Sequence, residues 1–212
     1  MQSRNPKVTA IEKQGRGRVG VSLDGLPALT VASEVAAEKG LRVGMGLSSQ
    51  QVAELVRADE LYRAHQAAVR YLGYRPRSEK EVRDRLRRGR FASTAIAEVM
   101  ARLKGLGLVD DAAFARFWKE GRESSRPRGR RLLKQELRRK GVEGEVIAEA
   151  VQDVDEEEGA YRAASKKART LHGLDERAFF RRLSQFLQRR GYGYDLVRRT
   201  VERLWQEQVD KS

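Results

Sequence analysis

Arginine and lysine side chains crowd into one short stretch of the chain. Eight of them fall within 15 residues: Arg126, Arg128, Arg130, Arg131, Lys134, Arg138, Arg139 and Lys140. A guanidinium group donates two parallel hydrogen bonds to a phosphate or carboxylate, and cations this dense repel one another until a partner neutralises them. The stretch predicts a contact with an anionic polymer. For any single cation, a solvated helix face remains the alternative.

The excess positive charge lies in the middle of the chain. The 212 residues carry 44 Lys and Arg against 30 Asp and Glu, a formal charge of +14. Residues 75–140 alone hold 21 basic and 9 acidic side chains, so nearly all of the excess falls there. No base-reading motif accompanies these cations. We therefore expect contacts with a nucleic-acid backbone, largely independent of sequence.

No group of residues has the spacing that catalysis or metal binding requires. The chain has no cysteine and two histidines, which leaves little for a metal site or a nucleophile. Asp110 and Asp111 could form an acid–base pair, but their place between two helical stretches favours helix capping. Gly15–Gly20 matches a dinucleotide fingerprint, yet it leads into an alternating strand, which predicts a loop. We expect no enzyme, no cofactor and no metal.

The composition also bears on the compartment. No apolar run approaches the roughly 18 residues of a membrane span, and the N-terminus lacks the apolar core of a signal peptide. With 35% charged residues, much of the chain must be solvated. We expect a cytoplasmic protein without membrane contact, and a monomer.

The first 50 residues have the period-two pattern of strands. Val19, Val21 and Leu23 alternate with small residues, and Asp24-Gly25 is a typical hairpin turn. The alternation resumes after the turn. We expect further strands at residues 8–13 and 41–45, and a short helix at 33–39. Residues 1–50 are predicted to form a small β-rich element.

Helical periodicity begins near residue 50 and continues to the end of the chain. Shifts of 51 and then 50 residues superimpose its apolar positions: Leu86 falls on Leu137, and Leu137 on Leu187. Each repeat has a leading helix, a basic helix, a turn and a third helix. The predicted fold is mainly α, with three tandem three-helix repeats in an elongated or crescent array. Their boundaries are 51–107, 108–154 and 155–212.

The turns and helix starts have local signatures. The basic helices end in Arg87-Arg88-Gly89, Arg138–Gly141 and Arg189–Gly191. Cations complement the negative end of the helix dipole there, and glycine can take the left-handed capping conformation. Ser48 with Gln51, and Ser78 with Glu81, have capping-box spacing.

The middle repeat carries a family resemblance. The run Leu108–Ala115 (LVDDAAFA), then Arg122, then the run Gly129–Gly141 (GRRLLKQELRRKG) resemble the signature of the RecX family, regulators of the bacterial RecA recombinase. The resemblance covers about residues 55–207. Residues 1–50 resemble an N-terminal β-hairpin extension of some members. The third repeat differs from the second, since Gln188 stands where the second repeat has Arg138 and the Leu-Asp-Asp run is missing.

The resemblance implies a regulator that binds the RecA filament on single-stranded DNA and suppresses ATP hydrolysis, strand exchange and coprotease activity. The alternative is a general, sequence-independent nucleic-acid-binding repeat protein without a recombinase partner, with RNA or double-stranded DNA as its ligand. The candidate contact residues are the cations of the first two repeats: Arg83, Arg87, Arg88, Arg122, Arg126, Arg128, Arg130, Arg131, Lys134, Arg138 and Arg139.

Overall fold

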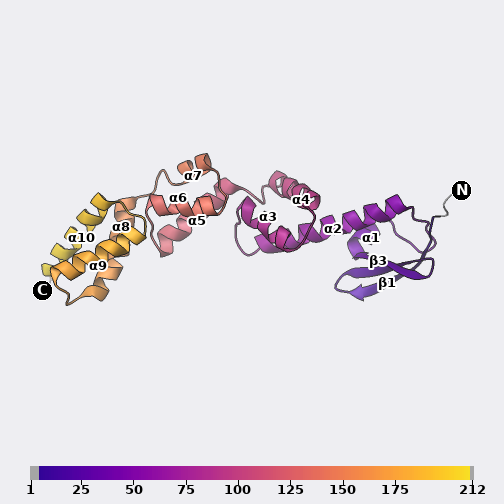
Figure 1. Cartoon of the computed structure of the whole chain (residues 1–212), viewed down its shortest axis with the longest axis horizontal. Coiled ribbons are helices and arrows are strands. Elements are labelled where there is room, and N and C mark those ends of the chain that lie inside the picture. Colours follow the sequence, from indigo (N-terminus) through magenta and orange to yellow (C-terminus); the bar gives the residue numbers. More distant parts are fainter. Residues whose placement is uncertain (1–4, 211–212) are drawn as a thin grey trace. The chain divides into compact units, whose positions relative to one another are not determined.

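A computed structural model of the chain describes residues 5–210 (Figure 1). These residues form a small sheet followed by a series of helices. The chain divides into two compact units. The first comprises residues up to 75 together with 82–109, and the second comprises residues 76–81 together with the chain from 110 onward.

The N-terminal sheet has three antiparallel strands in the order β1-β2-β3. They are β1 (Val8–Gly15), β2 (Arg18–Leu23) and β3 (Leu26–Ala32). Asp24 and Gly25 join β2 to β3 with φ of 48° and 84°, values that favour Asp and Gly in a hairpin turn. The glycine-rich stretch from residue 15 contains the turn between β1 and β2. The interpretation of Gly15–Gly20 as a loop holds only for Arg16 and Gly17, because Gly15 ends β1 and the residues from Arg18 onward belong to β2.

The segment after the sheet departs partly from expectation. Helix α1 (Ser33–Glu38) forms where it was predicted. The strand predicted at residues 41–45 is wrong, and only an isolated bridge between Lys7 and Gly46 forms nearby. Gly40 and Gly44 take φ of 61° and 88°, which interrupts an extended backbone.

The sheet is stabilised by the helix that follows it, α2 (Ser49–Leu72). Leu55 of α2 joins valines of all three strands in one hydrophobic cluster. The buried carboxylate of Asp59 accepts the Ala32 N–H at 2.7 Å and pairs with Arg18 and Arg63. A sheet this small therefore depends on α2 for a core and for its ion pairs.

The rest of the chain forms the three expected three-helix repeats, each with its own hydrophobic core. The helices of repeat 1 are α2, α3 (Glu79–Arg88) and α4 (Ser93–Gly105). Those of repeat 2 are α5 (Asp111–Ser125), α6 (Arg130–Arg139) and α7 (Gly144–Ala150). Those of repeat 3 are α8 (Glu156–Ala168), α9 (Glu176–Arg189) and α10 (Tyr194–Val209), with a 3-10 turn, η1 (Arg169–Leu171), after α8.

The predicted helix starts are confirmed. Ser48 and Gln51 exchange both hydrogen bonds of a capping box, and so do Ser78 and Glu81. The Asp110 carboxylate accepts the N–H groups of Ala112 and Ala113 at 2.8 and 3.0 Å. Asp110 therefore caps α5, as the sequence predicted.

The turn after the middle helix is the same in repeats 2 and 3 but not in repeat 1. Gly141 and Gly191 hold the left-handed position with φ of 82° and 89°. In repeat 1 the residue with positive φ is Arg90, at 59°, so the prediction that Gly89 supplies this cap is wrong. Gly89 has no room for a side chain, because a Cβ there would lie 2.8 Å from the Phe91 ring.

Candidate nucleic-acid interface

Helix α6 is the centre of the predicted contact surface. Leu133 and Leu137, one turn apart, are fully buried and fix which face of the helix meets the core. Arg131, Lys134 and Arg138 follow one another at spacings of three and four residues, so they share a stripe on the helix surface. The packing of two leucines therefore presents three cations together.

The predicted contact residues fall into two groups in the structure. The first group interacts within the chain. Arg87 forms an ion pair with Asp84 at 3.4 Å, and Arg122 and Arg128 form ion pairs with Glu136. Arg130 forms a hydrogen bond to Val154 and an ion pair with Glu156, and Arg83 also interacts with other residues. Others have no carboxylate within 4.0 Å among residues 5–210. They are Arg88, Arg126, Arg131, Lys134, Arg138 and Arg139. The second group is the one with charge available to a partner.

A buried carboxylate organises the first group in repeat 2. Glu136 is only 10% exposed at its side chain, and its Oε2 accepts from Arg122 Nε at 2.9 Å and from the Trp118 indole at 2.8 Å. Its Oε1 pairs with Arg128. The Arg122 guanidinium also lies 4.5 Å from the centre of the Trp118 ring. These contacts hold α5, α6 and the loop between them together.

The single charge of Glu136 does not balance the cations around it. Burial lowers the pKa of Arg128, and the nearby charges of Arg122, Arg190 and Arg126 lower it further. Burial likewise lowers the pKa of Arg190, with a contribution from the charge of Arg126. The loop between α5 and α6 is therefore a site of positive potential that favours an anion.

Arg130 has a structural role at the start of α6. Its Nη2 donates to the Val154 carbonyl at 2.8 Å, and its backbone N–H donates to the Glu156 carboxylate at 2.9 Å. Glu156 thus supplies an anion at a helix N-terminus that is otherwise flanked by cations.

Tyr194 is a further surface residue that was not predicted from the sequence. Its side chain is 71% exposed, and it shares the lining of a cavity of about 680 Å³ with Arg130, Arg131 and Lys134. Unpaired bases stack on exposed aromatic rings, and neighbouring cations bind the phosphates of the same strand. The sequence feature that could have identified Tyr194 is an aromatic residue at the start of a helix, in Gly193-Tyr194-Asp195. It lies in the repeat that follows the basic helix of repeat 2.

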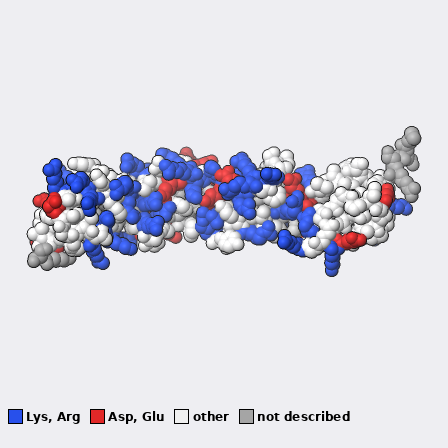
Figure 2. Space-filling model, turned by 60° about the horizontal axis from the view of Figure 1, so that its bottom comes forward, with Lys and Arg blue, Asp and Glu red and all other residues white. Residues whose placement is uncertain are grey.

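The positive charge on the surface is concentrated on the helical repeats. Figure 2 shows Lys and Arg side chains dense over the helical repeats and sparse over the N-terminal sheet. Among residues 5–210, no group of three or more His, Asp and Glu side chains is placed to hold a metal ion. No described helix is long and apolar enough to cross a membrane.

The architecture defines a class of protein: tandem three-helix repeats whose middle helix is basic. Sequence models of the first, second and third three-helix domains of RecX match residues 64–103, 110–151 and 155–201. The chain belongs to the RecX family.

Curated relatives extend over most of the chain. A regulatory protein RecX of Streptomyces lividans is 37% identical over 157 residues, which is 73% of this chain and 84% of that protein. A regulatory protein RecX of Bacillus licheniformis is 31% identical over 197 residues, 91% of this chain and 75% of that protein. Both relatives are named as regulatory proteins.

Solved structures agree with the fold. The crystal structure of a regulatory protein RecX has a TM-score of 0.68 with 27% identity, and covers 90% of this chain and 96% of that one. The crystal structure of RecX from Lactobacillus salivarius has a TM-score of 0.61 with 26% identity, and covers 69% of this chain and 97% of that one.

Proposed function

We propose that this protein binds the RecA filament on single-stranded DNA and suppresses its ATP hydrolysis, strand exchange and coprotease activity. Family membership supports a regulatory role, and the regulators that the resemblance implies act on RecA. The observation that carries the proposal is the group of unneutralised cations on α6 and the loop before it. These cations match the phosphates of a strand held by another protein.

The protein acts by binding in this proposal, without chemistry of its own. Arg126, Arg131, Lys134 and Arg138 contact phosphate oxygens or acidic side chains of the filament. Arg122 and Arg128 act through Glu136, which holds the loop in place. Arg88 and Arg139 extend the contact, and Arg83, Arg87 and Arg130 contribute charge while they remain bound within the chain. In this proposal the protein acts in the cytoplasm as a monomer.

The direct test adds purified protein to preformed RecA filaments on single-stranded DNA and follows ATP hydrolysis. We expect the rate to fall as the protein is added, in proportion to filament occupancy. An unchanged rate at saturating binding contradicts the proposal.

The alternative is a general nucleic-acid-binding repeat protein. Comparing the affinities for the filament and for naked DNA distinguishes it from a filament regulator. A filament regulator binds the filament more tightly than naked single-stranded DNA of the same length, whereas a general binder prefers neither. On naked DNA, roughly 6–10 phosphate contacts predict a loss of about three to five decades in affinity between 50 and 200 mM salt. Equal-length strands of different sequence should bind alike.

A further inference from the structure

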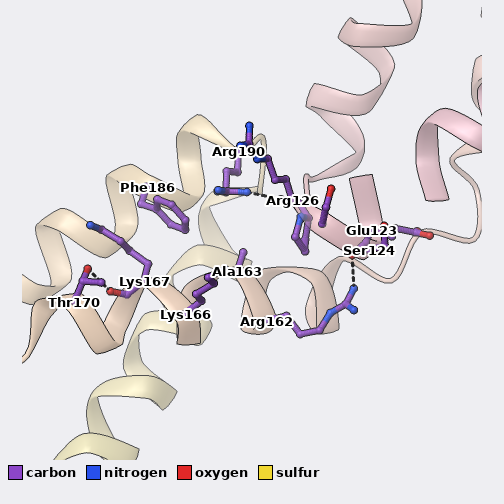
Figure 3. Close-up of a pocket in the computed structure, with 12 residues that line it drawn as sticks. Glu123, Ser124, Arg126, Arg162, Ala163, Lys166, Lys167, Thr170, Phe186 and Arg190 are labelled. Atoms are coloured by element: carbon purple, nitrogen blue, oxygen red, sulfur yellow. Dashed lines mark hydrogen bonds between the residues drawn. The ribbon is translucent and has the colours of Figure 1, made fainter. Parts of the chain in front are cut away.

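A second cationic cavity lies within the second unit, where repeats 2 and 3 meet. It has a volume of about 490 Å³ and lies between the end of α5, the loop after it, and helices α8 and α9 (Figure 3). Five cations line it: Arg126, Arg162, Lys166, Lys167 and Arg190. Of these five, only Arg126 is among the contact residues predicted from the sequence.

Few of these charges are neutralised inside the chain. Among the described residues that line the cavity, Glu123 is the one acid, and its backbone carbonyl accepts a hydrogen bond from Arg162 at 3.1 Å. Arg162 also lies 3.5 Å from Glu158. Arg126, Lys166 and Lys167 have no carboxylate within 4.0 Å among residues 5–210. The cavity therefore has an excess of positive charge.

Arg190 is held without losing its charge. Its Nη1 donates to the Pro127 carbonyl at 3.1 Å, and its guanidinium lies 4.5 Å from the centre of the Phe186 ring. A carbonyl and an aromatic ring orient a guanidinium but do not neutralise it, as a carboxylate does. Figure 3 shows Phe186 on α9, Arg190 directly after the end of α9, and Lys166 and Lys167 on α8. The arrangement is a preoriented cation beside two lysines that have no carboxylate partner among residues 5–210.

The cavity is also large and partly apolar. Its volume falls in the usual range of small-molecule sites, about 300–1,000 Å³, so it has room for more than an isolated phosphate. Phe186, Ala163 and Pro127 supply apolar lining. Planar bases stack on aromatic rings and on arginine guanidinium planes. The lining therefore combines groups for a phosphate with groups for a base.

We propose that this cavity binds one nucleotide unit, with its phosphate among Arg126, Arg190 and Lys166 and its base against the Arg190–Phe186 stack. The ligand class is a nucleoside phosphate, supplied by a DNA strand or by a free nucleotide. The inference deepens the proposed function and rests on it for the strand as the source.

The test measures binding of fluorescein-labelled pentathymidylate by anisotropy at about 50 mM salt, where phosphate contacts remain strong. The site variant is Lys166→Gln with Arg190→Gln. The matched control is Arg181→Gln with Arg182→Gln, two exposed cations of α9 outside the cavity. Loss of two charge-assisted contacts predicts about a tenfold or greater weakening in the site variant relative to the control. Equal affinities in the two variants overturn the site.

Competitors identify the source of the ligand. Unlabelled dTMP that displaces the probe, where thymidine does not, supports a site open to free nucleotides. Displacement by pentathymidylate alone, with the site variant weakened, supports the strand as the source. Inorganic phosphate that competes as well as dTMP overturns the nucleotide assignment.

A further variant separates binding from folding. Arg190→Lys keeps the charge but loses the planar stack, so we expect an affinity between those of the parent and the site variant, with an unchanged melting temperature. A site variant that melts like the parent and binds like the control contradicts the inference. If the parent protein leaves ATP hydrolysis by the filament unchanged but still binds dTMP in the cavity, the proposed function is contradicted. The nucleotide site is then still supported.

Discussion

Repeats 2 and 3 carry different side chains at the same point of the middle helix. The 50-residue shift that superimposes their buried leucines places Glu136 of α6 on Phe186 of α9. Glu136 binds Arg122, Arg128 and the Trp118 indole, so it neutralises part of the charge that surrounds it. Phe186 stacks under Arg190 and leaves that charge in place.

The difference shows how one scaffold produces two kinds of cationic surface. In repeat 2 the inner arginines are structural, and the cations available to a partner lie on the surface of α6 and in the loop before it. In repeat 3 the arginine at the end of α9 lines a cavity and remains available. The number of arginines in a repeat is therefore a poor guide to its binding strength, because their partners decide which charges are free.

The largest expected effect comes from reversing the free cations of repeat 2. The variant replaces four residues by Glu: Arg126, Arg131, Lys134 and Arg138. At about 1 kcal/mol for each lost contact, affinity for the filament should fall about a thousandfold. Folding should survive, since exposed substitutions usually change stability by about 0.5 kcal/mol or less. Filament cosedimentation and circular dichroism measure the two properties.

The matched reversal in repeat 3 sharpens this result. Arg198 and Arg199 already pair with Glu202 and Glu157 at 2.9 and 3.0 Å. Their replacement by Glu should weaken filament binding far less than the change in repeat 2. A repeat 2 variant that stays folded and inhibits as well as the parent shows that the wrong surface has been assigned.

The second effect tests the buried carboxylate. Glu136→Leu leaves Arg122 and Arg128 partly buried without a counter-charge, which should cost about 3 kcal/mol or more of stability. The matched change in repeat 3, Phe186→Leu, trades one apolar side chain for another and should cost about 1 kcal/mol. Urea unfolding followed by circular dichroism compares them. Equal losses in the two variants contradict a special role for Glu136.

The third effect concerns the turn in which repeat 3 meets repeat 2. Gly191 has φ of 89°, and a Cβ there would lie 2.5 Å from the Leu132 Cβ and 2.8 Å from its backbone nitrogen. Gly191→Ala should therefore cost about 2–3 kcal/mol. At Gly141 the three nearest atoms are Cβ, Cδ and Cγ of Lys80, of which Cγ and Cδ can move and none belongs to the backbone, so Gly141→Ala should cost less. Thermal unfolding gives the order, and a larger loss at Gly141 contradicts it.

The smallest effect has the opposite sign. Arg90 holds the left-handed position in repeat 1 that glycine holds in the other repeats. Arg90→Gly removes the strain of a side chain at positive φ, partly offset by the entropy of glycine in the unfolded chain. We expect a gain of about 0.5–1 kcal/mol in the free energy of unfolding, against no gain for Arg88→Gly within helix α3. A loss at Arg90 indicates that its side chain makes a stabilising contact.

The periodic signals in the sequence were sufficient for the fold class. Buried aliphatic residues four positions apart, repeated at intervals of about 50 residues, indicated the three helical repeats, and the capping residues Ser48, Ser78 and Asp110 indicated the starts of α2, α3 and α5. Such signals are local, because a helix cap or an apolar stripe depends on neighbours within one or two turns. The resemblance in the middle repeat identified the family for the same reason, since its motif is contiguous.

Local patterns failed where backbone conformation depended on a detail of the turn. The strand expected at residues 41–45 does not form, because glycines at 40 and 44 take positive φ. The cap expected at Gly89 falls one residue later, at Arg90. In both places the residue types permit two conformations, and the packing of the surrounding chain selects one.

The sequence by itself determined that this protein has basic helical repeats, which of its residues are positively charged, and that nearly all of the excess positive charge falls in residues 75–140. Only the tertiary structure decided which cations remain free. Glu136 meets Arg122 from 14 residues away in the chain, and Arg190 reaches the Pro127 carbonyl from 63 residues away. Ion pairs and cavities of this kind join residues that are distant in sequence, so the charge pattern alone cannot separate a structural arginine from a binding one.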